Sequence, residues 1–194
     1  SYQRSQSSFA SRSFKSTTIQ FLEKTISNSK IIYLGDFHTF DQNSKNVERI
    51  LKSLLTNIKP KEKLTIGVEF VQYHFQGVVD NFIDGVITEL EFLEMVGYQQ
   101  SWRFPWNHYR QFFQLAKENK LKVLALNSTG TLSERDVFAA KLITDYMKLF
   151  PSSKLLVLFG EYHIVKNKLP LNVEKQSQNQ FQSTIIHQNL DTIY

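Results

Sequence analysis

The sequence contains IIYLGDFH at residues 31–38 and LLVLFGEYH at residues 155–163, and these two stretches decide the fold. Each is an apolar, β-prone run that ends in glycine, an acid, an aromatic residue and histidine. A short apolar run without polar alternation is typical of a strand buried on both faces, as in the parallel sheet of an α/β protein. We therefore predict buried strands at residues 30–34 and 154–159, and we expect the polar residues that follow them to lie at the same edge of the sheet.

The rest of the chain alternates between apolar runs typical of strands and apolar spacings typical of helices. Further strands are expected at residues 64–70, 121–126 and 183–187. Apolar residues recur at helical spacing over residues 19–26, 47–58 and 134–150. This alternation predicts an α/β domain with a largely parallel sheet flanked by helices. Residues 71–119 exceed a simple crossover, and they predict a helical lobe between the second and third strands, over the end of the sheet.

Length and composition indicate the size of the folded domain and exclude several classes of protein. A chain of 194 residues with 41% apolar residues can bury one sizeable core. Residues 1–16 are rich in serine and lack acids, which predicts a flexible arm before a single domain at residues 17–194. No run approaches the roughly 20 apolar residues of a membrane-spanning helix. Because cysteine is absent, disulfide scaffolds, cysteine-type zinc sites and cysteine nucleophiles are excluded.

The charge pattern indicates which classes of molecule the chain is not expected to bind. The net charge is +5, but the basic residues are scattered among acids and form no stripe along a helix. The seven glycines do not gather into a phosphate-binding loop. We therefore expect neither nucleic acid nor a nucleotide as partner. Sixteen phenylalanines suit a large core or an apolar pocket for a small-molecule ligand.

Polar side chains follow the predicted strands at the points where these strands end. They are Asp36, His38, Glu69, Asn127, Glu161 and His163. If the chain stays extended, the acid and the histidine of each repeated phrase point to the same side, and Tyr162 points away from them. Two imidazoles with carboxylates suit a divalent ion of the Zn, Mn, Co or Fe type. The predicted metal ligands are His38, Glu69, Glu161 and His163.

Three functions are compatible with this set of residues. One is a metal-dependent hydrolase. The same residues could also work without a metal, as a general base with an acid partner. The predicted catalytic residues are Asp36, His38, Glu69 and His163. The third is a binding module in which the acid–histidine set is only a structural hydrogen-bond network.

The paired Gly-x-x-His phrases, with Glu69 after the second strand, resemble the ChaN-like haem-binding uptake family. Its superfamily also contains Tiki-type metalloproteases and erythromycin esterases. The resemblance extends through GVITELEFL at residues 85–93 and the aromatic block at residues 102–109, and it covers residues 31–191. Two positions depart from the pattern: Asp36 stands where glutamate is usual, and Glu161 stands where the family is often uncharged.

The resemblance implies a haem- or iron-binding protein of the bacterial cell envelope, periplasmic or at the surface, that takes part in haem or iron uptake. Attachment through a lipid anchor and a homodimer both stay open. Haem needs an apolar slot and an axial His, Tyr, Met or Cys ligand. The candidate haem-binding residues are Trp102, Trp106, Tyr109 and Tyr162.

The aromatic block has a second interpretation, in which it packs the lobe on the sheet. His74 and His108 lie among polar residues, which favours the surface. The cofactor, haem or a divalent metal, stays open at this point, as does the choice between an enzyme and a binding protein.

Overall fold

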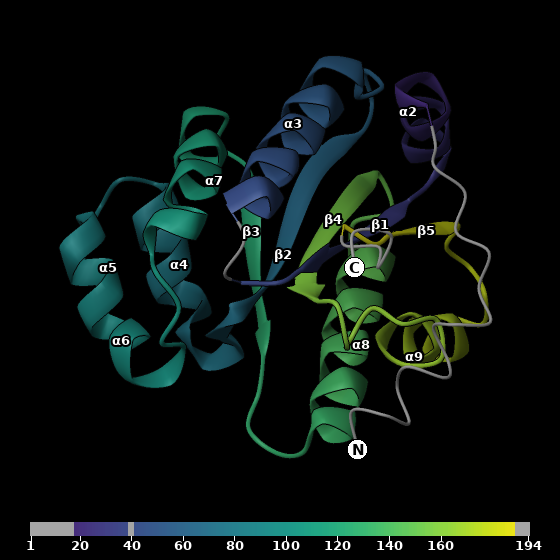
Figure 1. Ribbon diagram of the computed structural model, residues 1–194. Coiled ribbons are helices and arrows are strands. Elements are labelled where there is room, and N and C mark those ends of the chain that lie inside the picture. Colours follow the sequence, from purple (N-terminus) through teal and green to yellow (C-terminus); the bar gives the residue numbers. More distant parts are fainter. Residues whose placement is uncertain (1–17, 39–40, 189–194) are drawn as a thin grey trace, which may run out of the picture.

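The computed structural model describes residues 18–38 and 41–188 of the chain. The expected flexible arm at residues 1–16 lies outside the described residues. The described part folds into one parallel sheet with helices on both faces (Figure 1), which confirms the predicted α/β class.

The described sheet has five parallel strands in the order β3-β2-β4-β1-β5. Their bounds are β1 (Ile31–Asp36), β2 (Lys63–Gln72), β3 (Lys122–Asn127), β4 (Ser153–Gly160) and β5 (Ser183–Ile186). The two repeated phrases begin on neighbouring strands, because β1 pairs with β4 and Asp36 lies opposite Gly160. Both strands are buried along their whole length, which is why their sequences show no polar alternation.

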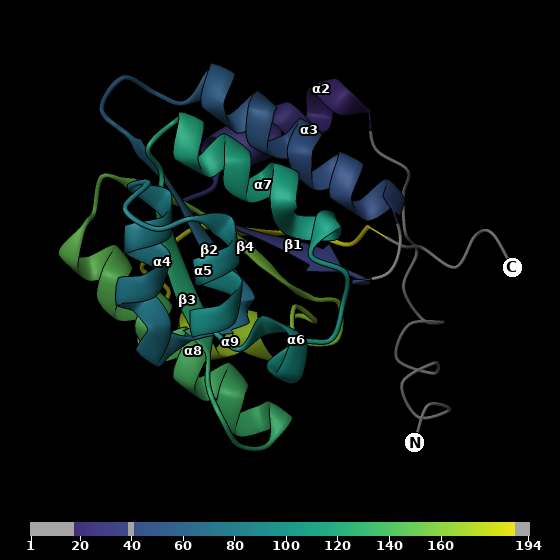
Figure 2. The ribbon, with the colours of Figure 1, turned by 90° about the vertical axis from the view of Figure 1, so that its left-hand side faces the viewer.

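Eight α-helices surround the sheet within the described residues. They are α2 (Ile19–Asn28), α3 (Asp41–Asn57), α4 (Gln76–Ile83), α5 (Glu89–Met95), α6 (Tyr98–Ser101), α7 (Asn107–Glu118), α8 (Leu132–Leu149) and α9 (Leu169–Gln176), and a 3-10 turn spans Tyr73–Phe75. The views in Figures 1 and 2 show α2, α3 and α7 on one face of the sheet and α8 and α9 on the other. In this part of the chain no helix is long and apolar enough to span a bilayer.

The two layers of helices bury two separate apolar clusters. Leu51 of α3 and Phe113 of α7 belong to the cluster on the first face, which also includes the helices of the insertion. Ile143 of α8 and Leu169 of α9 belong to the cluster on the second face. The fold is therefore a three-layer sandwich in which the sheet is covered on both sides.

The connection between β2 and β3 carries α4, α5, α6 and α7. Its first helix covers the edge of the sheet, because the amide of Gln76 donates to the carbonyl of Val123 at 2.7 Å and accepts from the nitrogen of Ala125 at 2.9 Å. These bonds use backbone groups of β3 to which a further strand would pair, so a side chain covers part of the exposed edge of this strand. The domain boundary at residue 17 stays a prediction.

The order of the strands creates a topological switch point at the end of β4. The chain leaves β1 and β2 toward the face of α3 and α7, but it leaves β4 toward the opposite face, where α9 lies. Because β4 lies between β2 and β1, the loops diverge on both sides of its last residue, Gly160. Ligands of open α/β sheets bind at such a point, outside the carboxyl ends of the strands.

Candidate functional site

The Asp36 cluster consists of Asp36, His38, His108 and Tyr109. The carboxylate of Asp36 accepts four hydrogen bonds: from the nitrogen of His38 at 2.9 Å, from His38 Nδ1 at 2.8 Å, from Tyr109 Oη at 2.8 Å and from His108 Nε2 at 3.1 Å. The end of β1 is thereby bonded to α7, which supplies both His108 and Tyr109. His108 is not a surface residue, since its side chain is only 6% exposed.

Burial would by itself raise the pKa of Asp36, but the hydrogen bonds from His108 and His38 outweigh burial and hold this pKa well below its ordinary value. Burial and the charge of Asp36 raise the pKa of Tyr109 above its ordinary value. Asp36 is therefore an ionised acceptor, and Tyr109 is a neutral donor.

The state of Asp36 assigns the tautomer of His38. Because an ionised carboxylate only accepts hydrogen bonds, His38 Nδ1 carries the hydrogen, and the lone pair of a neutral ring lies on Nε2. The ring lies against Phe104 and Trp102, with centroid distances of 4.6 and 5.0 Å. His38 also has a φ of 55°, which turns the backbone back toward Asp36 directly after the strand.

The Glu69 cluster consists of Glu69, Asn127, Arg135, Asp136 and His163. Arg135 contacts Glu69 Oε1 through Nη2 at 2.5 Å and donates to Asn127 Oδ1 through Nε at 2.9 Å. Both ring nitrogens of His163 face carboxylates, with Nδ1 at 2.5 Å from Asp136 and Nε2 at 3.3 Å from Glu69. The cluster thus joins the ends of β2, β3 and β4 to the first turns of α8.

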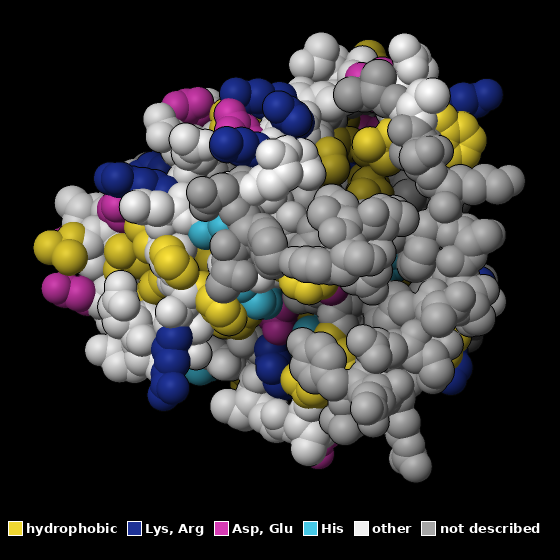
Figure 3. Space-filling view, viewed as in Figure 1, with side chains coloured by type: hydrophobic (Ala, Val, Ile, Leu, Met, Phe, Trp, Pro, Cys, Tyr) yellow, Lys and Arg dark blue, Asp and Glu magenta, His cyan; other side chains and the backbone are white. Residues whose placement is uncertain are grey.

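The two clusters meet at Gly160. Its backbone nitrogen donates to Glu69 Oε2 at 2.7 Å. A Cβ atom at this position would lie 3.2 Å from His38 Nε2 and 3.3 Å from Glu69 Oε2. The missing side chain of Gly160 therefore lets His38 and Glu69 pack closely against the backbone at the end of β4. In Figure 3, histidine and acidic side chains meet near the middle of the face, next to a basic side chain.

Glu161 lies elsewhere, so the expected pairing of acid and histidine in the second phrase is wrong. The chain turns after Gly160, with a bond of 2.8 Å from the nitrogen of His163 to the carbonyl of Gly160. Glu161 packs over Gly35 and accepts from His187 Nδ1 at 2.6 Å and from the nitrogen of Gln188 at 2.8 Å. Glu161, His187 and Gln188 form the Glu161 cluster, beside β5. The expectation failed because it assumed that β4 continues as an extended chain.

The structure does not support the predicted divalent metal. Among the described residues, no group of three or more His, Asp or Glu side chains is arranged to hold a metal ion. Of the four predicted ligands, Glu69 and His163 lie together, His38 lies across Gly160 from them, and Glu161 lies in its own cluster. The imidazole nitrogens Nδ1 of His38 and of His163 are held by carboxylates.

The four candidate haem-binding residues lie in different environments. Trp106 is buried among Phe92, Tyr98 and Phe113 in the core of the insertion, as the packing interpretation predicted. Tyr109 is buried in the Asp36 cluster, and Trp102 donates to its hydroxyl at 3.3 Å. Tyr162 is 49% exposed, just after β4.

Sequence reasoning missed Arg135, Asp136 and the role of His108. A signal for the first two existed in TLSE at residues 131–134, which forms a capping box at the start of α8. Residues in the first turns of that helix lie next to the strand ends. His108 carried no such signal, because only the packing of α7 beside α3 brings it to Asp36.

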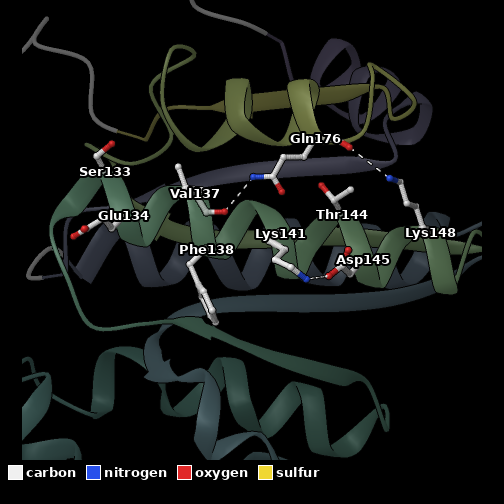
Figure 4. A pocket seen from close by; sticks show the side chains of 9 residues that line it. All are labelled: Ser133, Glu134, Val137, Phe138, Lys141, Thr144, Asp145, Lys148 and Gln176. Carbon is white, nitrogen blue, oxygen red and sulfur yellow. Dashed lines mark hydrogen bonds and ion pairs between the residues drawn. The ribbon is translucent and has the colours of Figure 1, made fainter.

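A groove of about 670 Å³ lies along α8, on the side of Val137 and Lys141 (Figure 4). Gln176 of α9 lines it from the neighbouring helix. No residue of the three clusters is among those that line this groove. The groove is therefore separate from the candidate site at the strand ends.

Comparison with known proteins identifies the relatives of this chain. Residues 22–135 match the family model described as haem-binding uptake, Tiki superfamily, ChaN. A solved structure of ChaN from Campylobacter jejuni, described as binding haem cofacially, is 16% identical, with a TM-score of 0.68 over 91% of this chain and 89% of that chain. At 16% identity, this similarity shows that the two chains share a fold.

A second solved structure, the C-terminal region of Pasteurella multocida toxin, is 14% identical, with a TM-score of 0.54 over 76% of this chain and 21% of that chain. No curated protein sequence gives a significant match. The family model covers more than half of the chain and includes the end of β1, the end of β2 and the whole insertion. The chain therefore belongs to the ChaN family of haem-binding uptake proteins in the Tiki superfamily.

Proposed function

We propose that this protein binds haem at the carboxyl edge of its sheet, beside Tyr162. Membership of a family described as haem-binding supports this function. The Campylobacter jejuni ChaN structure, which shares the fold, is described as binding haem. The observation that supports this position is the exposed phenol of Tyr162, just after β4.

The surroundings of Tyr162 fit the chemistry of haem. Phe37, at 40% exposure, follows the neighbouring strand β1, so two aromatic side chains stand at adjacent strand ends. The ammonium group of Lys168 lies 2.8 Å from the centre of the Tyr162 ring, and Lys166 is exposed nearby in the chain. Aromatic rings suit the flat porphyrin, and lysines suit its propionates. A tyrosine oxygen can ligate the iron.

Each residue then has a distinct role. Tyr162 would hold the iron, Phe37 would contact the porphyrin face, and Lys168 would pair with a propionate. The buried Tyr109 is not the ligand in this arrangement, since its hydroxyl donates to Asp36. In this proposal the protein binds haem as a ligand, because uptake requires a protein that holds haem.

A haemin titration that follows the Soret band tests the proposal. The wild-type chain is expected to saturate at a small fixed stoichiometry, with the spectrum of a tyrosine-ligated haem. Tyr162→Phe should weaken binding at least tenfold and change the spectrum. Tyr73→Phe is the matched control, because Tyr73 is 45% exposed but packs on Phe138 of α8. A wild-type response that never saturates would overturn haem binding. Wild-type behaviour of Tyr162→Phe would overturn the assigned ligand.

The role of Lys168 can be tested separately with haemin dimethyl ester, whose propionates carry no charge. Lys168→Met should weaken the binding of haemin several-fold and leave the binding of the ester unchanged. Equal losses for both ligands would show that Lys168 acts through packing on Tyr162.

We also propose a role in haem uptake at the bacterial cell envelope; the family description, haem-binding uptake, supports the uptake role. Fractionation of cells that produce the full-length protein tests this location, and recovery from the cytosol alone would contradict it. The homodimer stays a prediction, and sedimentation with and without haemin tests it.

A further inference from the structure

We propose that the edge strand β5 pairs with β5 of a second copy of this chain, and that the resulting dimer forms without haem. The two strands would run antiparallel about a two-fold axis, so that two sheets become one. The proposal rests on three features: the difference between the two edges of the sheet, the direction of the backbone groups of β5, and the absence of charge along this part of the chain.

The two edges of the sheet differ. At the edge formed by β3, the side chain of Gln76 bonds to backbone groups of Val123 and Ala125, so α4 covers part of that edge. The other edge is β5, which pairs only with β1. Figure 1 shows β5 at the margin of the sheet, between α2 and α9. Among the described residues, no hydrogen bond reaches the backbone of β5 on its outer side.

The direction of the backbone groups shows what β5 offers to another strand. The carbonyl of Gln182, directly before β5, accepts from the nitrogen of Ile31 and therefore points toward β1. Backbone groups alternate in direction along a strand, so those of Thr184 also face β1. The N–H and C=O groups of Ser183 and Ile185 then face outward, as a row of unpaired donors and acceptors.

The sequence of β5 lacks the devices that keep edge strands apart. Edge strands are commonly protected by lysine, by proline, by a bulge or by an inward charge. β5 reads Ser-Thr-Ile-Ile, and it pairs with β1 without a shift of register. Residues 176–190 contain no Asp, Glu, Lys or Arg, and their one histidine, His187, contacts the carboxylate of Glu161. Two copies of this stretch can therefore approach without repulsion between like charges.

A second copy of the chain fits this edge. An antiparallel pair with Ser183 of one copy opposite Ile185 of the other uses the outward groups of both residues in both copies. Such an interface is isologous, because each copy contributes the same surface. Since Gln76 occupies backbone groups at the opposite edge, the sheet does not extend further by the same contact, and the assembly closes at two copies.

The interface is separate from the proposed haem site. Tyr162 follows β4, and β1 lies between β4 and β5 in the sheet. Pairing through β5 therefore requires neither haem nor Tyr162.

Sedimentation velocity over a range of chain concentrations, without haemin, tests the dimer. We expect monomer at low concentration and dimer at high concentration. Ile185→Pro removes the outward N–H, and proline is tolerated where the N–H of an edge strand faces solvent. Each copy would lose one hydrogen bond across the interface, so the dissociation constant should rise about tenfold. Ile185→Val is the matched control, because it keeps the N–H and a β-branched side chain, and it should dimerise like the wild type.

Hydrogen exchange of the wild-type chain gives a readout that needs no variant, which matters because Ile185 also packs on the second apolar cluster. The amides of Ser183 and Ile185 should exchange more slowly as the chain concentration rises. The amide of Thr184, which faces β1, should be protected at every concentration. Protection of the two outward amides in the monomer would overturn the proposal, since another segment of this chain would then cover the edge.

Three results of the sedimentation experiment would also overturn it. One is a chain that stays monomeric at every concentration without haemin. Another is a folded Ile185→Pro chain that dimerises as tightly as the wild type. The third is a dimer that appears only with haemin and that Tyr162→Phe abolishes, which would show that haem holds the copies together. Haemin titrations keep the two proposals apart, because Ile185→Pro leaves Tyr162 unchanged and should bind haemin like the wild type.

Discussion

The hydroxyl of Tyr109 donates a hydrogen bond of 2.8 Å to the carboxylate of Asp36, across 73 residues of sequence. This bond joins the last residue of β1 to a helix of the insertion, and it is buried at both ends. It explains why the aromatic block at residues 102–109, which contains three of the candidate haem-binding residues, is packed against the sheet.

Removal of this hydroxyl should destabilise the fold. Tyr109→Phe leaves Asp36 with one donor fewer, and hydrogen bonds to charged groups contribute about 1.5–3 kcal/mol. We expect a loss of about 2 kcal/mol in the free energy of unfolding, measured with urea. Tyr98→Phe is the matched control, because the hydroxyl of Tyr98 is buried and makes no hydrogen bond in the structure. Equal losses in both variants would contradict the role of the Asp36 bond.

The ionised Asp36 should make the fold sensitive to acid. Its folded-state pKa lies below its ordinary value of about 3.9. Its contribution to stability is therefore complete above that ordinary value and is lost as the pH falls toward the folded-state pKa. Between about pH 5 and pH 2, the wild-type chain should lose more unfolding free energy than Asp36→Asn. This variant should itself be less stable at pH 7 by about 3 kcal/mol. Parallel pH curves for the two chains would refute the prediction.

A side chain at Gly35 should release the Glu161 cluster. A Cβ atom at this position would clash with the carboxylate of Glu161, so the carboxylate must leave His187 and the nitrogen of Gln188. Gly35→Ala should cost about 1–3 kcal/mol and speed hydrogen exchange in β5. In a Glu161→Ala background the same change should cost much less, because the clash and the contacts are already absent. An equal cost in both backgrounds would place the strain elsewhere.

The buried Lys154 should be essential for stability. Its ammonium group donates to the carbonyls of Ile26, Ser27 and Ser29 at 2.9, 2.9 and 2.7 Å, and so caps the end of α2. Lys154→Met leaves three acceptors without this donor, and we expect a loss of about 3 kcal/mol, seen as a lower melting temperature. Lys141→Met, at an exposed position of α8, should change it little. A Lys154→Met chain as stable as wild type would show that water replaces the ammonium group.

Much of the fold follows from local pattern. The apolar runs and helical spacings predicted the five strands of the described chain and the helices on both faces, because burial requires those periods. The predicted ends of the strands were less accurate. β1 extends through Gly35 and Asp36, which pair with β4, so the first phrase begins inside the strand.

The candidate site was predicted only in part, for a reason visible in its residues. Asp36, His38, Glu69 and His163 were placed near one another correctly, since parallel strands end at one edge. The partners that define their chemistry come from helices: His108 and Tyr109 from α7, and Asp136 from α8. Which turn of a helix faces a strand end depends on packing between layers, and this has no local signature.

The sequence by itself determined the strands, the sheet edge where polar residues gather and the family of the chain, because these depend on the order and spacing of residues. Only the tertiary structure decided how two phrases of the same pattern differ. Asp36 turns toward His38, whereas Glu161 turns away from His163 toward His187. The reason is physical: α7 lies over the end of β1, whereas the chain after β4 turns at once to the opposite face, so the same order of glycine, acid, aromatic residue and histidine meets different neighbours.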